Sequence, residues 1–261
     1  MNTGLLRRYN KIASSWNGDA YESLRRDDML SEIAKATNIA SLPAEAKVLE
    51  AMCGTAIVGI ALKEAIEKSG KICELTLLDF SQEMLDQTNI TTEKICADAC
   101  EMPFDCESFD LVITRFGIHD IEKEKQLLAI REVLRVVKKS SHYVLVTFCT
   151  SSETQFYYNK IANLKDELAG NKGEADRFFP TEEECLNLLR DAGFRSIEIK
   201  NRFFSRIKLQ ATGEMPEEKS KLWANFVINI PEEIKKEMNV QKQANGNFEY
   251  DFPVTIFVAG K

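Results

Sequence analysis

Residues 48–68 read VLEAMCGTAIVGIALKEAIEK and predict a strand, a tight turn and a helix in direct succession. The apolar run Val48–Met52 has the length of a buried strand, and Ile57–Lys68 carries apolar side chains at helical spacing. Gly54 gives the turn between them a permissive backbone. Because the free N–H groups of a helix start favour negative charge, this unit predicts a nucleotide-type pocket.

Short apolar runs and helices continue to alternate along the chain. Such alternation predicts βαβ units and a mostly parallel sheet, whose strands are continuous apolar runs because helices cover both faces. The predicted strands are Val48–Met52, Ile72–Leu78, Glu93–Ala97, Phe109–Thr114, Tyr143–Cys149, Ile197–Leu209 and Phe248–Ala259. The predicted helices among them are Ile57–Lys68, Ser81–Thr88, Glu122–Lys138, Glu153–Leu168 and one from the capping box Thr181/Glu184 to Gly193. We therefore expect an α/β fold with a Rossmann-like, seven-stranded, mostly parallel sheet and helices on both faces.

Helical patterns also stand outside this alternation. Residues 5–38 read as helical and Leu42-Pro43 ends them, which predicts an N-terminal helical cover over residues 1–42. Residues 43–261 are then expected to form the domain that holds the pocket. A helical pattern over Met215–Met238 predicts an insert, at about residues 213–240, before the last strand.

Composition narrows the range of partners. The 261 residues include 34 Lys and Arg against 41 Asp and Glu, a net charge of −7, which disfavours a protein that coats nucleic acid or an anionic membrane. No apolar run approaches the roughly 20 residues of a membrane-spanning helix. The start MNTGLLRRYN lacks an apolar signal core, so we expect a cytoplasmic protein. Seven cysteines without a CxxC pair, beside only two histidines, predict free thiols and no metal site.

Polar residues follow the next three strands. Asp79 ends the second strand in LTLLDFS, a position from which a carboxylate accepts hydrogen bonds from ribose hydroxyls. Asp98 follows the third strand in ICADACEMPF, where a carboxylate can accept a hydrogen bond from an exocyclic amine. The fourth strand leads into a loop that carries Arg115, Phe116, His119 and Asp120. Since open α/β sheets bind ligands at the carboxyl ends of their strands, we expect these residues to share one pocket.

The ordered motifs VLEAMCGT, LLDFS, ADACEMPF and FDLVITRFGIHDI resemble those of class I S-adenosylmethionine-dependent methyltransferases. The resemblance covers roughly residues 45–200 and is greatest to the small-molecule branch that includes ubiquinone and menaquinone biosynthesis enzymes. It implies S-adenosyl-L-methionine as the cofactor and S-adenosyl-L-homocysteine as its product. The implied reaction is in-line transfer of the methyl group to an O, N or C atom of a small-molecule acceptor.

The resemblance also assigns residues to the cofactor. It implies Glu50 and Gly54 at the methionine part, Asp79 at the ribose, and Asp98 with the Ala99 backbone at the adenine. Three further residues of these motifs are expected to contact the cofactor as well: Met52, Phe80 and Arg115. Met52 and Ala56 depart from the family pattern, because they stand where its first and last glycines are usual.

His119 is the candidate catalytic base, because a hydroxyl or protonated amine acceptor needs one. His142 begins a predicted core strand, away from the ligand edge, and Asp120 and Arg115 are weaker candidates for orienting groups. Packing of His119 beside the cofactor is the alternative, and the sequence leaves it open.

Tyr9, Trp16 and Phe116 are candidates for contact with the acceptor. The segment YNKIASSW, which contains Tyr9 and Trp16, resembles the family's N-terminal cover over the active site. Ordinary packing of the two aromatic side chains is the alternative.

Other classes of protein compete with this interpretation. Nucleic-acid methyltransferases of this fold carry an Asn/Asp-Pro-Pro-aromatic sequence after the fourth strand or a Pro-Cys nucleophile, and here residues 114–117 read TRFG and no Pro-Cys dipeptide occurs. A nicotinamide-dependent oxidoreductase is disfavoured by the missing GxGxxG and by Asp98. A catalytically weak S-adenosylmethionine-binding partner subunit and a methyltransferase acting on a macromolecule stay open, the former because of Ala56 and the lack of an unambiguous base.

Overall fold

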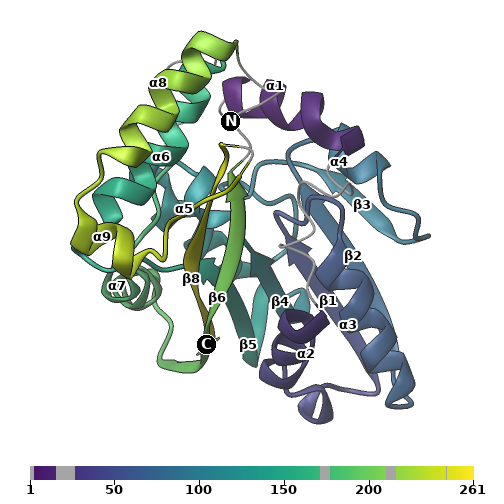
Figure 1. Cartoon of the computed structure of the whole chain (residues 1–261). Helices are drawn as coiled ribbons and strands as arrows, with labels where there is room; N and C mark the ends of the chain where they lie inside the picture. The colour runs from purple at the N-terminus through teal and green to yellow at the C-terminus, as the bar shows by residue number, and fades with distance from the viewer. Residues whose placement is uncertain (1–2, 16–26, 171–176, 210–215, 245) are drawn as a thin grey trace.

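The structure of the chain, a computed structural model, describes residues 3–15, 27–170, 177–209, 216–244 and 246–261. One sheet of eight strands runs through the described residues, with the order β3-β2-β1-β4-β5-β8-β6 and with β7 paired to β8 (Figure 1). Its strands are β1 Glu45–Ala51, β2 Ile72–Asp79, β3 Glu93–Cys96, β4 Phe109–Arg115, β5 Val137–Phe148, β6 Ser196–Leu209, β7 Gln241–Lys242 and β8 Phe248–Gly260. The helices are α1 Thr3–Ile12, α2 Asp27–Ala36, α3 Ile57–Lys68, α4 Gln82–Asp86, α5 Lys123–Val136, α6 Gln155–Leu168, α7 Glu182–Ala192, α8 Glu217–Ile228 and α9 Glu232–Glu237, with short 3-10 turns at Ala13–Ser15, Ile39–Ser41 and Ile118–Asp120.

The strand order creates a crevice at the middle of the sheet. Neighbouring strands from β3 to β5 pair in parallel, whereas β8 is antiparallel to both β5 and β6. The chain winds outward from β1 in one direction to β2 and β3, and then in the other direction to β4 and β5. At such a reversal the loops that leave adjacent strands diverge, which is where open α/β sheets bind ligands.

Both faces of the sheet are buried under helices. Val48 of β1 packs into a core formed with α2, α3, α6 and α8, while its neighbour Leu49 packs into a second core formed with α5 and α7. Successive residues of a strand point to opposite faces of the sheet. Because helices cover both faces, the side chains on each face must be apolar, which explains the continuous apolar runs of the sequence.

The two N-terminal helices lie in different places. Helix α1 lies above the carboxyl ends of the parallel strands, near α4 (Figure 1). Helix α2 packs beside α3, β5 and β8, on one face of the sheet. No helix among the described residues combines the length and the apolar character that crossing a membrane requires.

The predicted fold class is confirmed, with two corrections. The predicted count of seven strands is wrong by one, because β7 is only two exposed residues, Gln241–Lys242, and carries no apolar run. The predicted helix Glu122–Lys138 ends at Val136, and β5 begins at once at Val137 rather than at Tyr143. The first part of this strand was not predicted because residues 138–141 read KKSS and form no apolar run. They are half-buried or exposed, at a part of the sheet that faces solvent.

Candidate functional site

Three left-handed residues shape the loop between β1 and α3. Met52, Gly54 and Ala56 have φ angles of 57°, 54° and 60°. A residue with a side chain pays about 1–2 kcal/mol for this conformation. Met52 and Ala56 therefore adopt the backbone conformation that glycine would adopt in this turn, at a cost in free energy. The turn brings the Gly54 backbone to the wall of a pocket, and Ala56 becomes the N-cap of α3.

Asp79 joins this loop to the end of β2. Its Oδ2 accepts a hydrogen bond from the Gly54 N–H at 2.7 Å, and its Oδ1 accepts one from the Ser81 N–H at 3.0 Å. Burial raises the pKa of Asp79 to about 6, although these backbone donors oppose the shift. The carboxylate is thus largely ionised at neutral pH, and its remaining lone pairs can accept hydrogen bonds from a bound ligand.

The loop after β3 forms another wall of the pocket. Asp98 Oδ1 accepts a hydrogen bond from the Cys100 N–H at 2.9 Å, and the intervening Ala99 is buried. Phe80 and Met84 line the same pocket. A carboxylate beside apolar surface provides the polar and flat contacts that a purine ring needs.

Arg115 brings a buried positive charge to the end of β4. It lines the pocket, and its guanidinium carbon lies 5.0 Å from the centre of the Phe116 ring. Burial lowers the pKa of Arg115 to about 10, with Glu50 opposing the shift, so the side chain stays protonated at neutral pH. Glu50 itself does not line the pocket; it is buried behind the loop, where its Oε2 accepts a hydrogen bond from the Gly59 N–H of α3 at 2.7 Å.

Aromatic side chains gather at another part of the pocket. The rings of Phe116 and Phe148 stack with their centroids 4.1 Å apart and only 3° between their planes. Tyr9 of α1 meets Phe80 edge to face, with centroids 5.6 Å apart. The His119 ring lies 5.3 Å from the Phe148 ring and stacks on Phe179 at 4.7 Å. This region can therefore hold a flat, largely apolar ligand.

His119 is a neutral base at neutral pH. Its side chain is 8% exposed, and burial lowers its pKa although Asp120 opposes the shift. The His119 Nε2 lies 3.6 Å from Asp120 Oδ2, which also accepts a hydrogen bond from the Tyr9 hydroxyl at 2.5 Å. Within the described residues, His119 Nδ1 is buried without a hydrogen-bond partner. An uncharged imidazole with an unused nitrogen is able to accept a proton.

Most residues predicted from the sequence share this one pocket. Its lining includes Tyr9, Met52, Gly54, Asp79, Phe80, Asp98, Ala99, Arg115, Phe116 and His119. Glu50 lies behind it, and Trp16 lies outside the described residues. Three residues from later parts of the chain also reach this region and were not predicted from the sequence: Phe148, Phe179 and Arg177. Only the final residues of an apolar strand pointed to Phe148, and no local pattern marked the other two.

The pocket meets the requirements of S-adenosylmethionine. The pocket is open to solvent, and its lining residues come from α1 and from the carboxyl ends of β1, β2, β3, β4 and β5 with the loops that follow them. Asp79 offers acceptors for ribose hydroxyls, Arg115 offers a cation for a carboxylate, and Ala99 with Phe80 offers apolar surface for adenine. Charged and apolar groups thus occur in the combination that the cofactor's chemistry demands.

Comparisons with known proteins agree with this pocket. The family model of the ubiE/COQ5 methyltransferase family matches residues 23–209. The chain is 32% identical over 181 residues to a demethylmenaquinone methyltransferase from Geobacillus sp. (strain WCH70), covering 60% of this chain and 74% of that protein. It is 28% identical over 220 residues to another from Alkalihalophilus pseudofirmus, covering 75% and 86% respectively. The crystal structure of the YcgJ protein from Bacillus subtilis superimposes with a TM-score of 0.74 at 17% identity, covering 90% of this chain and 99% of that one.

Fold, pocket and relatives together define an S-adenosylmethionine-dependent methyltransferase that acts on a small-molecule acceptor. Within this class, the chain belongs to the ubiE/COQ5 methyltransferase family. The cofactor and the reaction type inferred from the sequence motifs are thereby confirmed.

Proposed function

We propose that the acceptor is a reduced quinone, a ring with two hydroxyl groups, and that the methyl group goes to a ring carbon. The observation that carries the proposal is the stacked pair Phe116 and Phe148 beside the buried, neutral His119. Aromatic walls suit a flat ring, and a neutral imidazole suits removal of a phenolic proton. The names of similar proteins support this choice, since they include demethylmenaquinone methyltransferase and a ubiquinone/menaquinone biosynthesis C-methyltransferase from Rickettsia bellii.

The proposed assignment of the cofactor residues follows from their chemistry. Asp79 accepts from the ribose hydroxyls, Asp98 and the Ala99 backbone hold the adenine, and Arg115 pairs with the methionine carboxylate. Met52, Gly54 and Phe80 complete the contacts through backbone and apolar surface. Glu50 acts indirectly, by holding the start of α3 through the hydrogen bond that it accepts from the Gly59 N–H. The bound cofactor supplies an electrophilic methyl group on a sulfonium.

The protein's own part in the reaction is proton transfer and positioning. His119 Nδ1 takes the hydroxyl proton of the acceptor, and the resulting phenolate places electron density on the neighbouring ring carbon. As that carbon bonds to the methyl carbon, the methyl–sulfur bond breaks and its electron pair stays on sulfur, which leaves S-adenosylhomocysteine. The methylated carbon then loses its ring proton to solvent, which restores the aromatic ring as a phenolate, and protonated His119 returns its proton to that oxygen. Tyr9 and Phe116 hold the ring in line with the methyl group and keep water out.

The test is the position of a labelled methyl group. The purified chain is incubated with S-adenosylmethionine carrying a ¹³C-methyl group and with short-chain demethylated naphthoquinol and benzoquinol, kept reduced. We expect a new carbon-bound methyl signal in the NMR spectrum of the product. A methoxy signal, or transfer only to amines or carboxylates in a parallel acceptor set, would overturn the proposal. Unreduced quinones serve as the control, because they have no phenolic proton to remove.

A further inference from the structure

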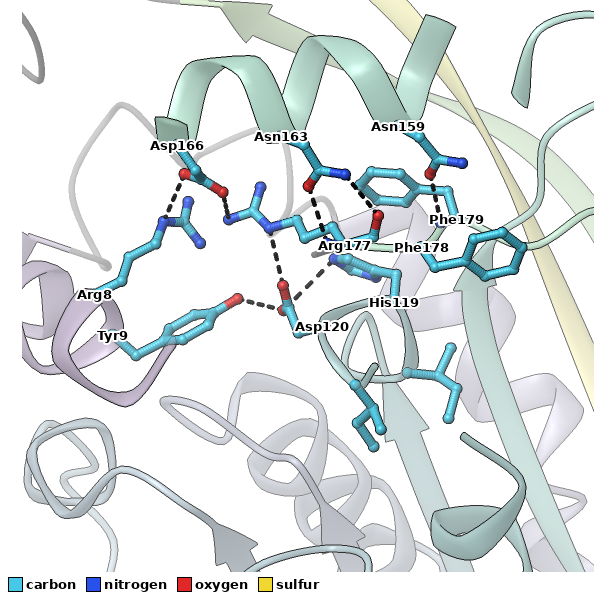
Figure 2. Close-up of polar contacts among 12 residues, drawn as sticks. Arg8, Tyr9, His119, Asp120, Asn159, Asn163, Asp166, Arg177, Phe178 and Phe179 are labelled. Atoms are coloured by element: carbon cyan, nitrogen blue, oxygen red, sulfur yellow. Dashed lines mark hydrogen bonds and ion pairs between the residues drawn. The ribbon is translucent and has the colours of Figure 1, made fainter. Parts of the chain in front are cut away.

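A chain of buried charges reaches the pocket from the far side of the aromatic region. Arg8 Nε lies 3.3 Å from Asp166 Oδ1, and Arg177 Nη2 lies 3.4 Å from Asp166 Oδ2. Arg177 Nε lies 3.0 Å from Asp120 Oδ1. Figure 2 shows how these side chains converge from α1, from α6 and from the two loops below α6. All four side chains are at most 14% exposed.

A gain in folding stability does not by itself explain this series of buried ion pairs. Burying each ion costs several kcal/mol, and a buried ion pair is often no more stable than apolar residues of the same volume. What distinguishes this one is its end point, because Asp120 is a pocket residue and touches the proposed base. The charges therefore bear on the groups that face the acceptor.

Both oxygens of Asp120 are engaged, each in a different task. Oδ1 faces Arg177, and Oδ2 faces the Tyr9 hydroxyl at 2.5 Å and His119 Nε2 at 3.6 Å. Burial and the nearby Asp120 carboxylate raise the pKa of Tyr9 well above its usual value, so Tyr9 remains a donor. A carboxylate held at one oxygen by a fixed cation presents its other oxygen in a fixed direction.

Arg177 is itself held firmly. Its backbone N–H donates to Asn163 Oδ1 at 2.9 Å, and its carbonyl accepts from Asn163 Nδ2 at 3.0 Å. The next residue, Phe178, donates its N–H to the His119 carbonyl at 3.0 Å, and Phe179 stacks on the His119 ring (Figure 2). Residues 177–179 therefore hold His119 in three ways. Phe178 bonds to its backbone carbonyl, Phe179 stacks on its ring, and Arg177 pairs with the neighbouring Asp120.

We propose that Arg177 is a positioning residue for methyl transfer, which acts through Asp120 to fix His119 and Tyr9 at the acceptor end of the pocket. The inference rests on the proposed role of His119 as the base. Asp166 of α6 pairs with Arg177 and so keeps it in place. Arg8 pairs with the same Asp166 and connects these ion pairs to α1, the helix that carries Tyr9.

The first test compares Arg177→Gln, Arg177→Lys and the control Arg202→Gln. Arg202 is a matched control because it forms an exposed ion pair with Glu182, away from the pocket. We expect Arg177→Gln to lower kcat at least tenfold with the Kd for S-adenosylhomocysteine within about threefold of the wild type. Arg177→Lys keeps the charge and should recover part of kcat, whereas Arg202→Gln should match the wild type.

A pH profile separates positioning from a merely structural effect. Among the described residues, the charged and titratable groups of this region include Arg8, Tyr9, Asp79, His119, Glu122, Lys125, Asp166 and Arg177. Removing the cation at residue 177 leaves the Asp120 carboxylate free to stabilise the protonated His119 imidazole, so the acidic limb of kcat should move to higher pH in Arg177→Gln and stay in place in Arg177→Lys. Loss of kcat in proportion to the folded fraction, with the acidic limb unmoved, would overturn the proposal, as would a wild-type kcat.

An NMR titration makes the test independent of the acceptor. The chain has two histidines, and His142 lies on β5 with its Nε2 2.9 Å from the Thr37 carbonyl, so it serves as an internal control. In the S-adenosylhomocysteine complex, Arg177→Gln should raise the pKa of His119 and leave that of His142 unchanged, because Asp120 loses its compensating cation. An unchanged His119 titration would overturn the proposal. If His119 shifts as expected but no quinol is methylated, the positioning role stands and only the acceptor assignment fails.

Discussion

Asp79 holds a structural and a ligand-facing position at once. Its two oxygens fix the Gly54 and Ser81 backbone, so the same carboxylate shapes the loop and lines the pocket, where we propose that it accepts hydrogen bonds from the ribose hydroxyls. We predict that Asp79→Asn weakens binding of S-adenosylhomocysteine at least tenfold, because an amide cannot accept at both atoms. Isothermal titration calorimetry measures this directly. Asp86→Asn, an exposed carboxylate of α4, is the matched control, and equal affinity in the two variants would refute the ribose assignment.

Under the proposed mechanism, His119 acts on the acceptor rather than on the cofactor. We predict that His119→Gln lowers kcat by about 10²-fold or more, the usual contribution of a general base, with the Kd for S-adenosylhomocysteine within about threefold of the wild type. Steady-state kinetics with a saturating acceptor gives the answer. His142→Gln should keep its kcat, since that ring lies near the middle of β5, beside the Thr37 carbonyl, and does not line the pocket. Normal turnover of His119→Gln would leave His119 with a packing role only.

Residues within a contiguous motif were the easiest to predict. Gly54 and Asp79 come from different strands, yet their positions at the ends of neighbouring parallel strands predicted that they meet, and they lie one hydrogen bond apart. The position of Glu50 was harder to predict. The alternation of side chains along a strand shows which face of the sheet Glu50 points to, but not that the start of α3 lies over it. The roles of all these residues toward cofactor and acceptor stay predictions.

At the level of elements, Gly59 couples α3 to the loop before it. Alanine in a helix interior usually stabilises by about 1 kcal/mol relative to glycine. Here a Cβ on Gly59 would lie 2.6 Å from Glu50 Oε2 and 3.2 Å from side chains of β2. We therefore predict that Gly59→Ala is destabilising, lowering Tm by several degrees, and that it weakens S-adenosylhomocysteine binding by displacing α3 from Glu50. Thermal unfolding with and without the ligand tests both parts; a raised Tm would contradict the argument.

Element boundaries followed the sequence where local chemistry fixed them. The capping box at Thr181 and Glu184 formed as predicted, since a helix start satisfies its free N–H groups with nearby side chains. The junction between α5 and β5 did not, because Val136 and Val137 suit either element and no turn residue separates them. Pairing with β4 and β8, a long-range property, decides where that strand begins.

Over the whole molecule, contacts between distant segments carried the least sequence signal. The buried charges of Arg8, Asp120, Asp166 and Arg177 come from four segments spread over most of the chain. An arginine or aspartate in isolation predicts a solvated surface, and only the packing of α1, α6 and the two loops makes these four partners. The division of the chain at residue 42 likewise stays a prediction, although α1 and α2 occupy different sides of the fold.

The pocket also sets how stability of the free protein depends on pH. Burial raises the pKa of Glu50 to about 7 and that of Asp79 to about 6, above the ordinary values of 4.5 and 3.8. At these two sites the folded state binds more protons than the unfolded state between about pH 4 and 7, so their contribution to the free energy of unfolding falls as pH rises. The contribution of each carboxyl is fully present below its unfolded pKa and is lost as pH rises through its folded pKa. His119 acts in the opposite sense, because its lowered pKa removes stability as pH falls below about 6.5.

Glu50→Gln isolates the largest of these contributions. For Glu50 alone, the shift corresponds to about 3 kcal/mol between pH 4 and pH 8. We predict that urea unfolding of Glu50→Gln, without cofactor, gives a flatter dependence on pH between 5 and 8 than the wild type, by about 2–3 kcal/mol over that interval. Glu64→Gln removes an exposed carboxylate of α3 and should leave the wild-type slope. Parallel curves for Glu50→Gln and the wild type would mean that Glu50 is ionised in the fold, and its charge would then be balanced by Arg115 rather than by a proton.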